Sequence, residues 1–138
     1  METTNSEKKL KRLKIPSGSK WEDIVGYSRL IKSGNTIEVA GTTATNEEGT
    51  IMGKEDPFQQ TIYILKKIET YLEKAGASME DVVRTRMFVT DIGQWEEIGK
   101  AHAAFFKAIK PVATMVEVSK LIHPDLLVEI EVTAILSD

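Results

Sequence analysis

The chain has 138 residues, 41% of them hydrophobic and 28% charged, which is the balance of an ordinary globular protein and the length of one domain. It contains no cysteine, so disulfides, thiolate metal ligands and cysteine nucleophiles are excluded. A net charge of −3 gives no overall field that would gather nucleic acid or anionic lipid. Because no apolar segment follows the basic start and no apolar run approaches the roughly 20 residues that span a bilayer, we expect a cytoplasmic protein without a membrane partner.

Residues 1–18 are predicted to form a flexible polar arm, and residues 19–138 a single domain. The arm carries a basic run without interleaved aromatic residues, formed by Lys8, Lys9, Lys11, Arg12 and Lys14. Such a run can contact RNA phosphates, but the domain behind it is acidic. A solvated arm is therefore the favoured interpretation, and nucleic acid is not expected as a partner.

Two short β-rich stretches follow, at 27–31 and 36–42, with Ser33-Gly34-Asn35 between them as a tight hairpin turn. A helix then begins at Asp56-Pro57, because Asp56 can cap free N–H groups and Pro57 suits the first helical position. Apolar residues continue along it at steps of three and four, and Gly76 ends it.

The second half of the chain adds a β-branched strand at 82–90 and a second helix whose apolar stripe runs from Trp95 to Ile109, ended by Pro111. Two further strands are predicted at 113–118 and 127–136. The order β-β-α-β-α-β-β predicts an α+β fold with one sheet and two helices on one of its faces.

Alternation along the strands predicts which side chains face the helices. The helix-facing set is Val128, Ile130, Val132, Ala134 and Leu136 in the last strand, Val83, Thr85, Met87 and Val89 in the middle strand, and Ile37 and Val39 in the second strand. The opposite face receives Glu38, Ala40, Thr42, Arg84, Arg86, Phe88, Met115, Leu127, Glu129, Glu131 and Thr133. This second face mixes charged and apolar residues, so it either lies in solvent with surface ion pairs or meets another subunit.

Between residues 27 and 135 the chain resembles the RidA/YjgF family, also called the endoribonuclease L-PSP family. The stretches that carry the resemblance are Gly26-Tyr27, Val39-Ala40-Gly41-Thr42, Gly76-Ala77-Ser78, Asp81-Val82-Val83, Phe88-Val89-Thr90-Asp91, Phe105-Phe106, Val116-Glu117-Val118 and Val128-Glu129-Ile130-Glu131. The resemblance implies a chorismate-mutase-like fold, a homotrimer and ligand clefts between subunits. It also implies hydrolysis of 2-imino acids or their enamine tautomers without a metal or organic cofactor.

Several positions depart from the family's deaminases. Where the family has Pro-Ala-Arg-Ser, this chain has Pro111-Val112-Ala113-Thr114, so alanine replaces the arginine that grips the substrate carboxylate. The other departures are Ala40 for a serine, Thr42 for a glutamine, Gly99 for an asparagine and Met115 for a residue that is often cysteine. Ordinary 2-imino acid deamination is therefore not expected.

The resemblance nevertheless assigns a candidate site. Glu129 matches the glutamate that orders the attacking water, although its alternative role is to pair with an arginine. The candidate ligand-binding residues are Tyr27, Ala40, Gly41, Thr42, Arg86, Ala113, Thr114 and Met115.

Two candidates remain open from the residues themselves. By strand parity Arg86 shares a face with Ala113 and Glu129, so it either anchors an anionic ligand or neutralises a glutamate. His102 lies on the apolar stripe of the second helix and is either a core residue or a proton-transfer group. His102 and His123 lack carboxylates at ligand spacing, so no metal site is predicted.

Two functions are compatible with this sequence. The first is a hydrolase of an imine, an enamine or a related small electrophile, carried by Glu129 and Tyr27. The second is a non-catalytic trimer that binds a small molecule, such as a carboxylate, or a protein, which the alanine at 113 favours. A ribonuclease is a weaker third option, because the sequence offers no pair of acid–base groups for cleavage without a metal.

Overall fold

The computed structural model describes residues 11–137, which form one six-stranded sheet in the order β1-β2-β3-β6-β4-β5. All neighbouring strands are antiparallel except β4 and β5. The strands are β1 (Arg12–Ile15), β2 (Leu30–Ser33), β3 (Thr36–Thr43), β4 (Val82–Val89), β5 (Val112–Glu117) and β6 (Val128–Ile135). The helices are α2 (Lys20–Val25), α3 (Pro57–Lys74) and α4 (Trp95–Phe106), with short 3₁₀ turns η1 (Met79–Asp81) and η2 (Ile92–Gln94).

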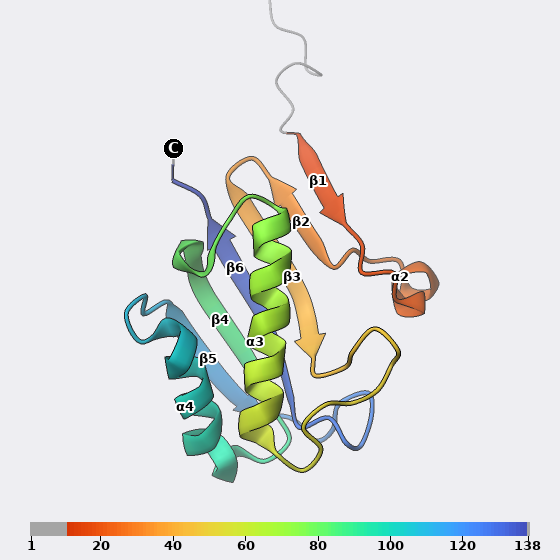
Figure 1. Ribbon diagram of the computed structural model, residues 1–138, viewed down its shortest axis with the longest axis vertical. Helices are drawn as coiled ribbons and strands as arrows, with labels where there is room; N and C mark the ends of the chain where they lie inside the picture. The colour runs from red at the N-terminus through yellow and green to blue at the C-terminus, as the bar shows by residue number, and fades with distance from the viewer. Residues whose placement is uncertain (1–10, 138) are drawn as a thin grey trace, which may run out of the picture.

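Helices α3 and α4 lie side by side over one face of the sheet, and no helix within residues 11–137 covers the other face (Figure 1). This confirms the predicted α+β arrangement with two helices on one face. The Asp56 side chain accepts a hydrogen bond of 3.0 Å from the Gln59 N–H at the start of α3, and Gly76 follows the helix with a φ of 82°. Helix α4 ends at Phe106, three residues before the predicted Ile109.

The core lies between the sheet and the two helices. Strand β6 crosses its centre, and its helix-facing residues Val128, Ile130, Val132 and Ala134 are at most 2% exposed, as alternation predicted. Helix α3 supplies four fully buried residues, Ile64, Leu65, Ile68 and Leu72. The chain's own helices therefore cover the apolar face of the sheet.

One residue of the predicted core is wrong. Val83 is 40% exposed, whereas its neighbour Val82 is buried. The pairing of β4 with β6 shifts between Val82 and Arg84, which face the consecutive residues Ala134 and Thr133. Val83 is thus the extra residue of a β-bulge, and the bulge reverses the alternation before it.

The N-terminal region also differs from the prediction. Of the predicted flexible arm, Arg12–Ile15 form strand β1, which pairs with β2 at the edge of the sheet. Polar residues suit an exposed edge strand, so composition alone suggested a loose arm. Residues 1–10 of the arm, including Lys8 and Lys9 of the basic run, lie outside the described residues.

Helix α2 was not predicted, although its sequence carries both end signals. The Ser19 side chain accepts a hydrogen bond from the Trp21 N–H, and Gly26 ends the helix with a φ of 92°. The helix lies beside the edge of the sheet formed by β1 and β2 (Figure 1). It has no part in covering the core face, and it carries Glu22, whose carboxylate lies 3.9 Å from Arg29 Nε.

Candidate functional site

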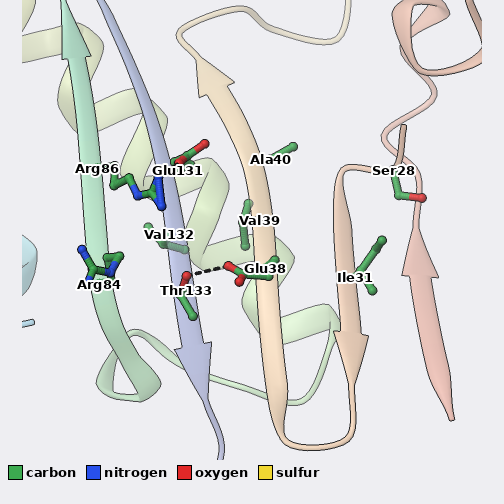
Figure 2. A pocket seen from close by; sticks show the side chains of 10 residues that line it. All are labelled: Ser28, Ile31, Glu38, Val39, Ala40, Arg84, Arg86, Glu131, Val132 and Thr133. Carbon is green, nitrogen blue, oxygen red and sulfur yellow. Dashed lines mark hydrogen bonds and ion pairs between the residues drawn. The ribbon is translucent and has the colours of Figure 1, made fainter. Parts of the chain in front are cut away.

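The helix-free face of the sheet is hollowed. A depression of about 370 Å³ crosses β2, β3, β6 and β4, and both arginines of β4 point toward it (Figure 2). Its lining residues are Ser28, Ile31, Glu38, Val39, Ala40, Arg84, Arg86, Glu131, Val132 and Thr133. This face thus combines charged and apolar residues, as the alternation of the strands predicted, and it is concave as well.

Two pairs of charged or polar side chains cross this hollow. Arg86 Nη1 lies 3.4 Å from Glu131 Oε1, and the Thr133 hydroxyl donates a hydrogen bond of 2.5 Å to Glu38 (Figure 2). Arg84 has no ion partner within 4 Å among residues 11–137. The hollow therefore contains one arginine held by a glutamate and one without a carboxylate partner.

A β-bulge in β3 shapes the edge of this hollow. Val39 pairs with Val132 and Thr42 pairs with Ile130, so Ala40 and Gly41 together face the single residue Glu131. The extra residue turns Thr42 into the core, where it is 1% exposed. The prediction that Thr42 shares the open face with Ala40 is therefore wrong, and the extra bulge residue is the reason.

Glu129 lies against the bulge. A Cβ built on Gly41 would overlap the Glu129 carboxylate, so this side chain occupies the space above the glycine. Gly41 does not have a positive φ, and the need for glycine at this position comes from the close approach of Glu129. The bulge and the glutamate thus form one structural unit.

The environment of Glu129 favours its protonated form. Burial raises the pKa of Glu129 above the usual 4.5, the nearby positive charge of Arg29 lowers it, and the negative charge of Glu131 raises it. The net direction is upward because burial dominates. A carboxyl group with a raised pKa is better suited to holding and passing a proton near neutral pH than an exposed one.

Sequence reasoning missed Arg29. This arginine is 8% exposed, and its Nη1 donates hydrogen bonds to the Gly41 carbonyl (2.8 Å) and the Thr42 hydroxyl (2.9 Å). The ring of Tyr27, which is 37% exposed, lies 5.7 Å from the Arg29 guanidinium carbon. The available signal was a single arginine within the predicted β-rich stretch 27–31. An arginine at such a position is buried only where it has polar partners.

The three candidates at the start of β5 divide between the two faces. Thr114 pairs with Arg86 and joins it in a second hollow of about 330 Å³ with Phe88 and Val116. Ala113 pairs with the buried Thr85, and Met115 pairs with Met87 and packs against the core. Ala113 and Met115 are therefore not on the face of Arg86 and Glu129, because the register of β5 is opposite to the one predicted.

His102 also lies on the covered side of the sheet. Its Nε2 is 2.9 Å from the hydroxyl oxygen of Thr85, and its ring centroid lies 4.7 Å from that of Phe106, with the two rings tilted by 42°. Burial lowers the pKa of His102 below the usual 6.5, which favours the neutral ring. The sheet thus separates His102 from Glu129.

Of the predicted site residues, the open face brings together Ala40, Gly41, Arg86, Thr114 and Glu129, with Tyr27 nearby at the Arg29 side chain. Within residues 11–137 no group of three or more histidine, aspartate and glutamate side chains is arranged to hold a metal ion. In the same range no helix is long and apolar enough to cross a membrane.

Known proteins are similar to this chain in sequence and in fold. The family model described as Endoribonuclease L-PSP matches residues 18–136. An uncharacterised protein of Streptomyces coelicolor is 32% identical over 121 residues, which cover 88% of this chain and 90% of that protein. A RutC family protein of Pyrococcus abyssi is 36% identical over 108 residues, covering 78% and 84% of the two chains.

Solved structures agree. A member of the YjgF/YER057c/UK114 family from Mycobacterium tuberculosis is 47% identical with a TM-score of 0.83, and the match covers 91% of this chain and all 100% of that one. A member of the Rid family from Yersinia pestis is 29% identical with a TM-score of 0.79, over 91% and 100% of the chains. The fold is thus that of small single-sheet proteins of the Rid type. The chain belongs to the endoribonuclease L-PSP family, also known as the RidA/YjgF family.

Proposed function

We propose that this protein is a homotrimer that hydrolyses a small electrophile of the imine or enamine class in clefts between its subunits. The observation that carries the proposal is Glu129, a partly buried carboxyl group with a raised pKa at the edge of an open, hollowed sheet face. The absence of cysteines supports a cytoplasmic setting.

In the proposed reaction, water adds to the carbon of the C=N bond while Glu129 accepts a proton from that water. Glu129 returns that proton to the nitrogen. It then takes the proton of the new hydroxyl and passes it to the same nitrogen, so that the tetrahedral adduct expels ammonia as the C=O bond forms. A group that alternately accepts and returns a proton needs a pKa near the working pH, and the burial of Glu129 moves its pKa in that direction.

The substrate is proposed to differ from an ordinary 2-imino acid. Ala113 offers no guanidinium for a carboxylate, and by register its exposed side chain is on the side of Thr85 and not on the open face. Arg86 and Arg84 are the cations that line the hollow instead. A substrate with a differently placed acidic group, or with none, fits this arrangement better than a 2-imino acid does.

A non-catalytic binding trimer is the second candidate. It is favoured by the ion pair between Arg86 and Glu131, because this pair leaves only Arg84 without a carboxylate partner in the hollow among residues 11–137. It is also favoured by the alanine at 113, because a scaffold that kept its fold and lost its anchor would bind without reacting. A ribonuclease remains the weaker option, since His102 and Glu129 lie on opposite sides of the sheet.

The test is the loss of imines that an amine oxidase generates from amines without a 2-carboxylate, followed by trapping with semicarbazide, and 2-imino acids from an amino-acid oxidase are the comparison substrates. We expect the parent protein to accelerate imine loss and Glu129→Gln to lose about 10²-fold or more, as general acid–base catalysis predicts. Glu38→Gln is the matched control, because Glu38 lines the same face but is bound to Thr133, and it should retain activity. If no imine is consumed faster with the parent than without it, the binding trimer replaces the enzyme.

A further inference from the structure

Arg29 is bound to the bulge of β3 at three consecutive residues. Its Nη1 donates to the carbonyl oxygens of Gly41 at 2.8 Å and Ala40 at 3.4 Å, and to the hydroxyl of Thr42 at 2.9 Å. The Thr42 hydroxyl in turn donates to the Ala40 carbonyl at 2.8 Å. One buried guanidinium therefore donates hydrogen bonds to a polar group of each residue from Ala40 to Thr42.

The bulge needs such a donor. An extra residue in a strand interrupts the ladder, so its carbonyl oxygens lack the regular partners on the neighbouring strand. A buried carbonyl without a donor costs free energy, and a charged donor satisfies it more strongly than a neutral one. Arg29 thus stabilises the one irregular segment on which the Glu129 carboxylate rests.

We propose that Arg29 is a positioning residue for Glu129: by fixing the Ala40–Thr42 bulge it presents the bare Cα of Gly41 to the Glu129 carboxylate and sets a positive charge behind it. The proposal rests on the proposed function only for the role of Glu129 in proton transfer. Arg29 itself is 8% exposed, with its Nη1 bound to the bulge and its Nε facing Glu22.

The positive charge of Arg29 also changes the pKa values of two groups outside the bulge, Glu129 and Lys67. It opposes the rise in the pKa of Glu129, and it adds to the effect of burial that lowers the pKa of Lys67 to about 8. Lys67, on α3, donates to the carbonyl oxygens of Thr43 at 3.0 Å and Thr45 at 2.7 Å. Two cations therefore fix β3 from the bulge to just beyond its end.

Helix α2 supplies the counter-ion. Glu22, whose side chain is 6% exposed, places Oε2 3.9 Å from Arg29 Nε. The same carboxylate accepts hydrogen bonds from the backbone N–H (3.0 Å) and the hydroxyl of Ser17. The segment from Ser17 to Glu22 is thus connected to Glu129 through Arg29, which gives the short edge helix a role in the site.

The first test is a ¹³C NMR titration of the Glu129 carboxyl carbon. We expect Arg29→Gln to raise the pKa of Glu129, because the attraction that favours the carboxylate is lost. Arg12→Gln is the matched control: it removes an exposed arginine beside Ser33, at the hairpin end of β2, whereas Glu129 pairs with Thr43 at the far end of β3. An unchanged pKa of Glu129 in a folded Arg29→Gln protein would overturn the proposal.

Two further variants guard against misfolding. Arg29→Gln leaves Glu22 buried without its cation, so Glu22→Gln is combined with it to restore neutrality, and the same rise in the pKa of Glu129 is expected. Arg29→Lys keeps the charge, but its ammonium lies one bond nearer the backbone than Nη1, and the Nε donor that faces Glu22 is lost. Its crystal structure should show displaced Gly41 and Glu129, and unchanged positions of both would also overturn the proposal.

The second readout is the pH profile of kcat/KM for imine hydrolysis. In Arg29→Gln we expect the acid limb to move to higher pH and kcat/KM to fall about tenfold to a hundredfold, as misplacement of a reacting group produces. A purely structural role would lower activity without moving the limb. If the parent protein hydrolyses no imine, the proposed function fails while the NMR titration still decides the role of Arg29.

Discussion

Arg86 and Glu131 form an ion pair across strands β4 and β6, with 3.4 Å between Nη1 and Oε1 and side-chain exposures of 53% and 36%. An exposed pair of this kind contributes about 0–1 kcal/mol to stability, because solvent screens it and both side chains lose freedom. A guanidinium carries five N–H donors, so one contact leaves others available to a ligand. The pair is thus a weak structural element at a place where an anion can compete for the arginine.

Replacing Arg86 by Met tests this competition. We expect the free energy of unfolding to fall by no more than about 1 kcal/mol, as for a surface pair. We expect the calorimetric affinity for small carboxylates to weaken by about 2–5 kcal/mol, as for a lost buried charge partner, because the proposed trimer covers this face. Arg84→Met, measured beside it, reports the share of the second cation in the same hollow. Unchanged carboxylate binding in Arg86→Met would restrict Arg86 to its pairing with Glu131.

Gly41→Ala should be destabilising. The added Cβ would overlap the Glu129 carboxylate, so the side chain must move, at a cost of about 1 kcal/mol or more in urea unfolding. Gly99 provides a control of opposite sign: a Cβ there meets nothing within 4 Å, and alanine should stabilise α4 by about 0.5–1 kcal/mol. Equal effects of the two variants would contradict the close approach of Glu129 to Gly41.

Stability should fall in mildly acidic solution because of His102. Folding lowers its pKa below the usual 6.5, so the unfolded chain binds this proton first as the pH falls. The contribution of His102 is fully present above pH 6.5 and is lost below it. The free energy of unfolding, measured with urea at several pH values between neutral and mildly acidic, should therefore change less with pH in His102→Gln than in the parent.

The proposed trimer is tested by light scattering. The open sheet face exposes apolar side chains, among them Val112 at 57% and Val116 at 41%, beside Phe88 and the charges of the hollow. Such a surface is better covered than left in water. We expect a mass about three times that of the 15.4 kDa chain at micromolar concentration, and a monomer would contradict the proposal.

Ala113→Arg is expected to create or raise 2-imino acid deaminase activity, measured with the semicarbazide assay. Ala113 is exposed at the start of β5, so the larger side chain meets no core. The register directs the new side chain toward the side of Thr85, however, and it must bend around the strand to reach the open face. A folded, trimeric variant without activity would show that this register, together with Ala40, Gly99 and Met115, separates the chain from the deaminases.

The sequence predicted those parts of the fold that depend on local patterns. Asp56 and Gly76 mark the ends of α3 whatever surrounds it, and apolar spacing identifies the covered face of α3 and α4. Strict alternation likewise identified the buried face of β6, because β6 itself contains no extra bulge residue. Glu129 was placed correctly on the open face for the same reason.

Only the tertiary structure decided where alternation is interrupted. Val83 and Thr42 changed faces because each follows or forms a bulge, and a bulge exists only relative to the partner strand β6. A shift of one residue moves every later side chain to the other face, so the error spreads along the strand. The same applies to Arg29: its sequence neighbours give no sign of the bulge carbonyls that it binds, because those partners are brought to it by the pairing of β3 with β6.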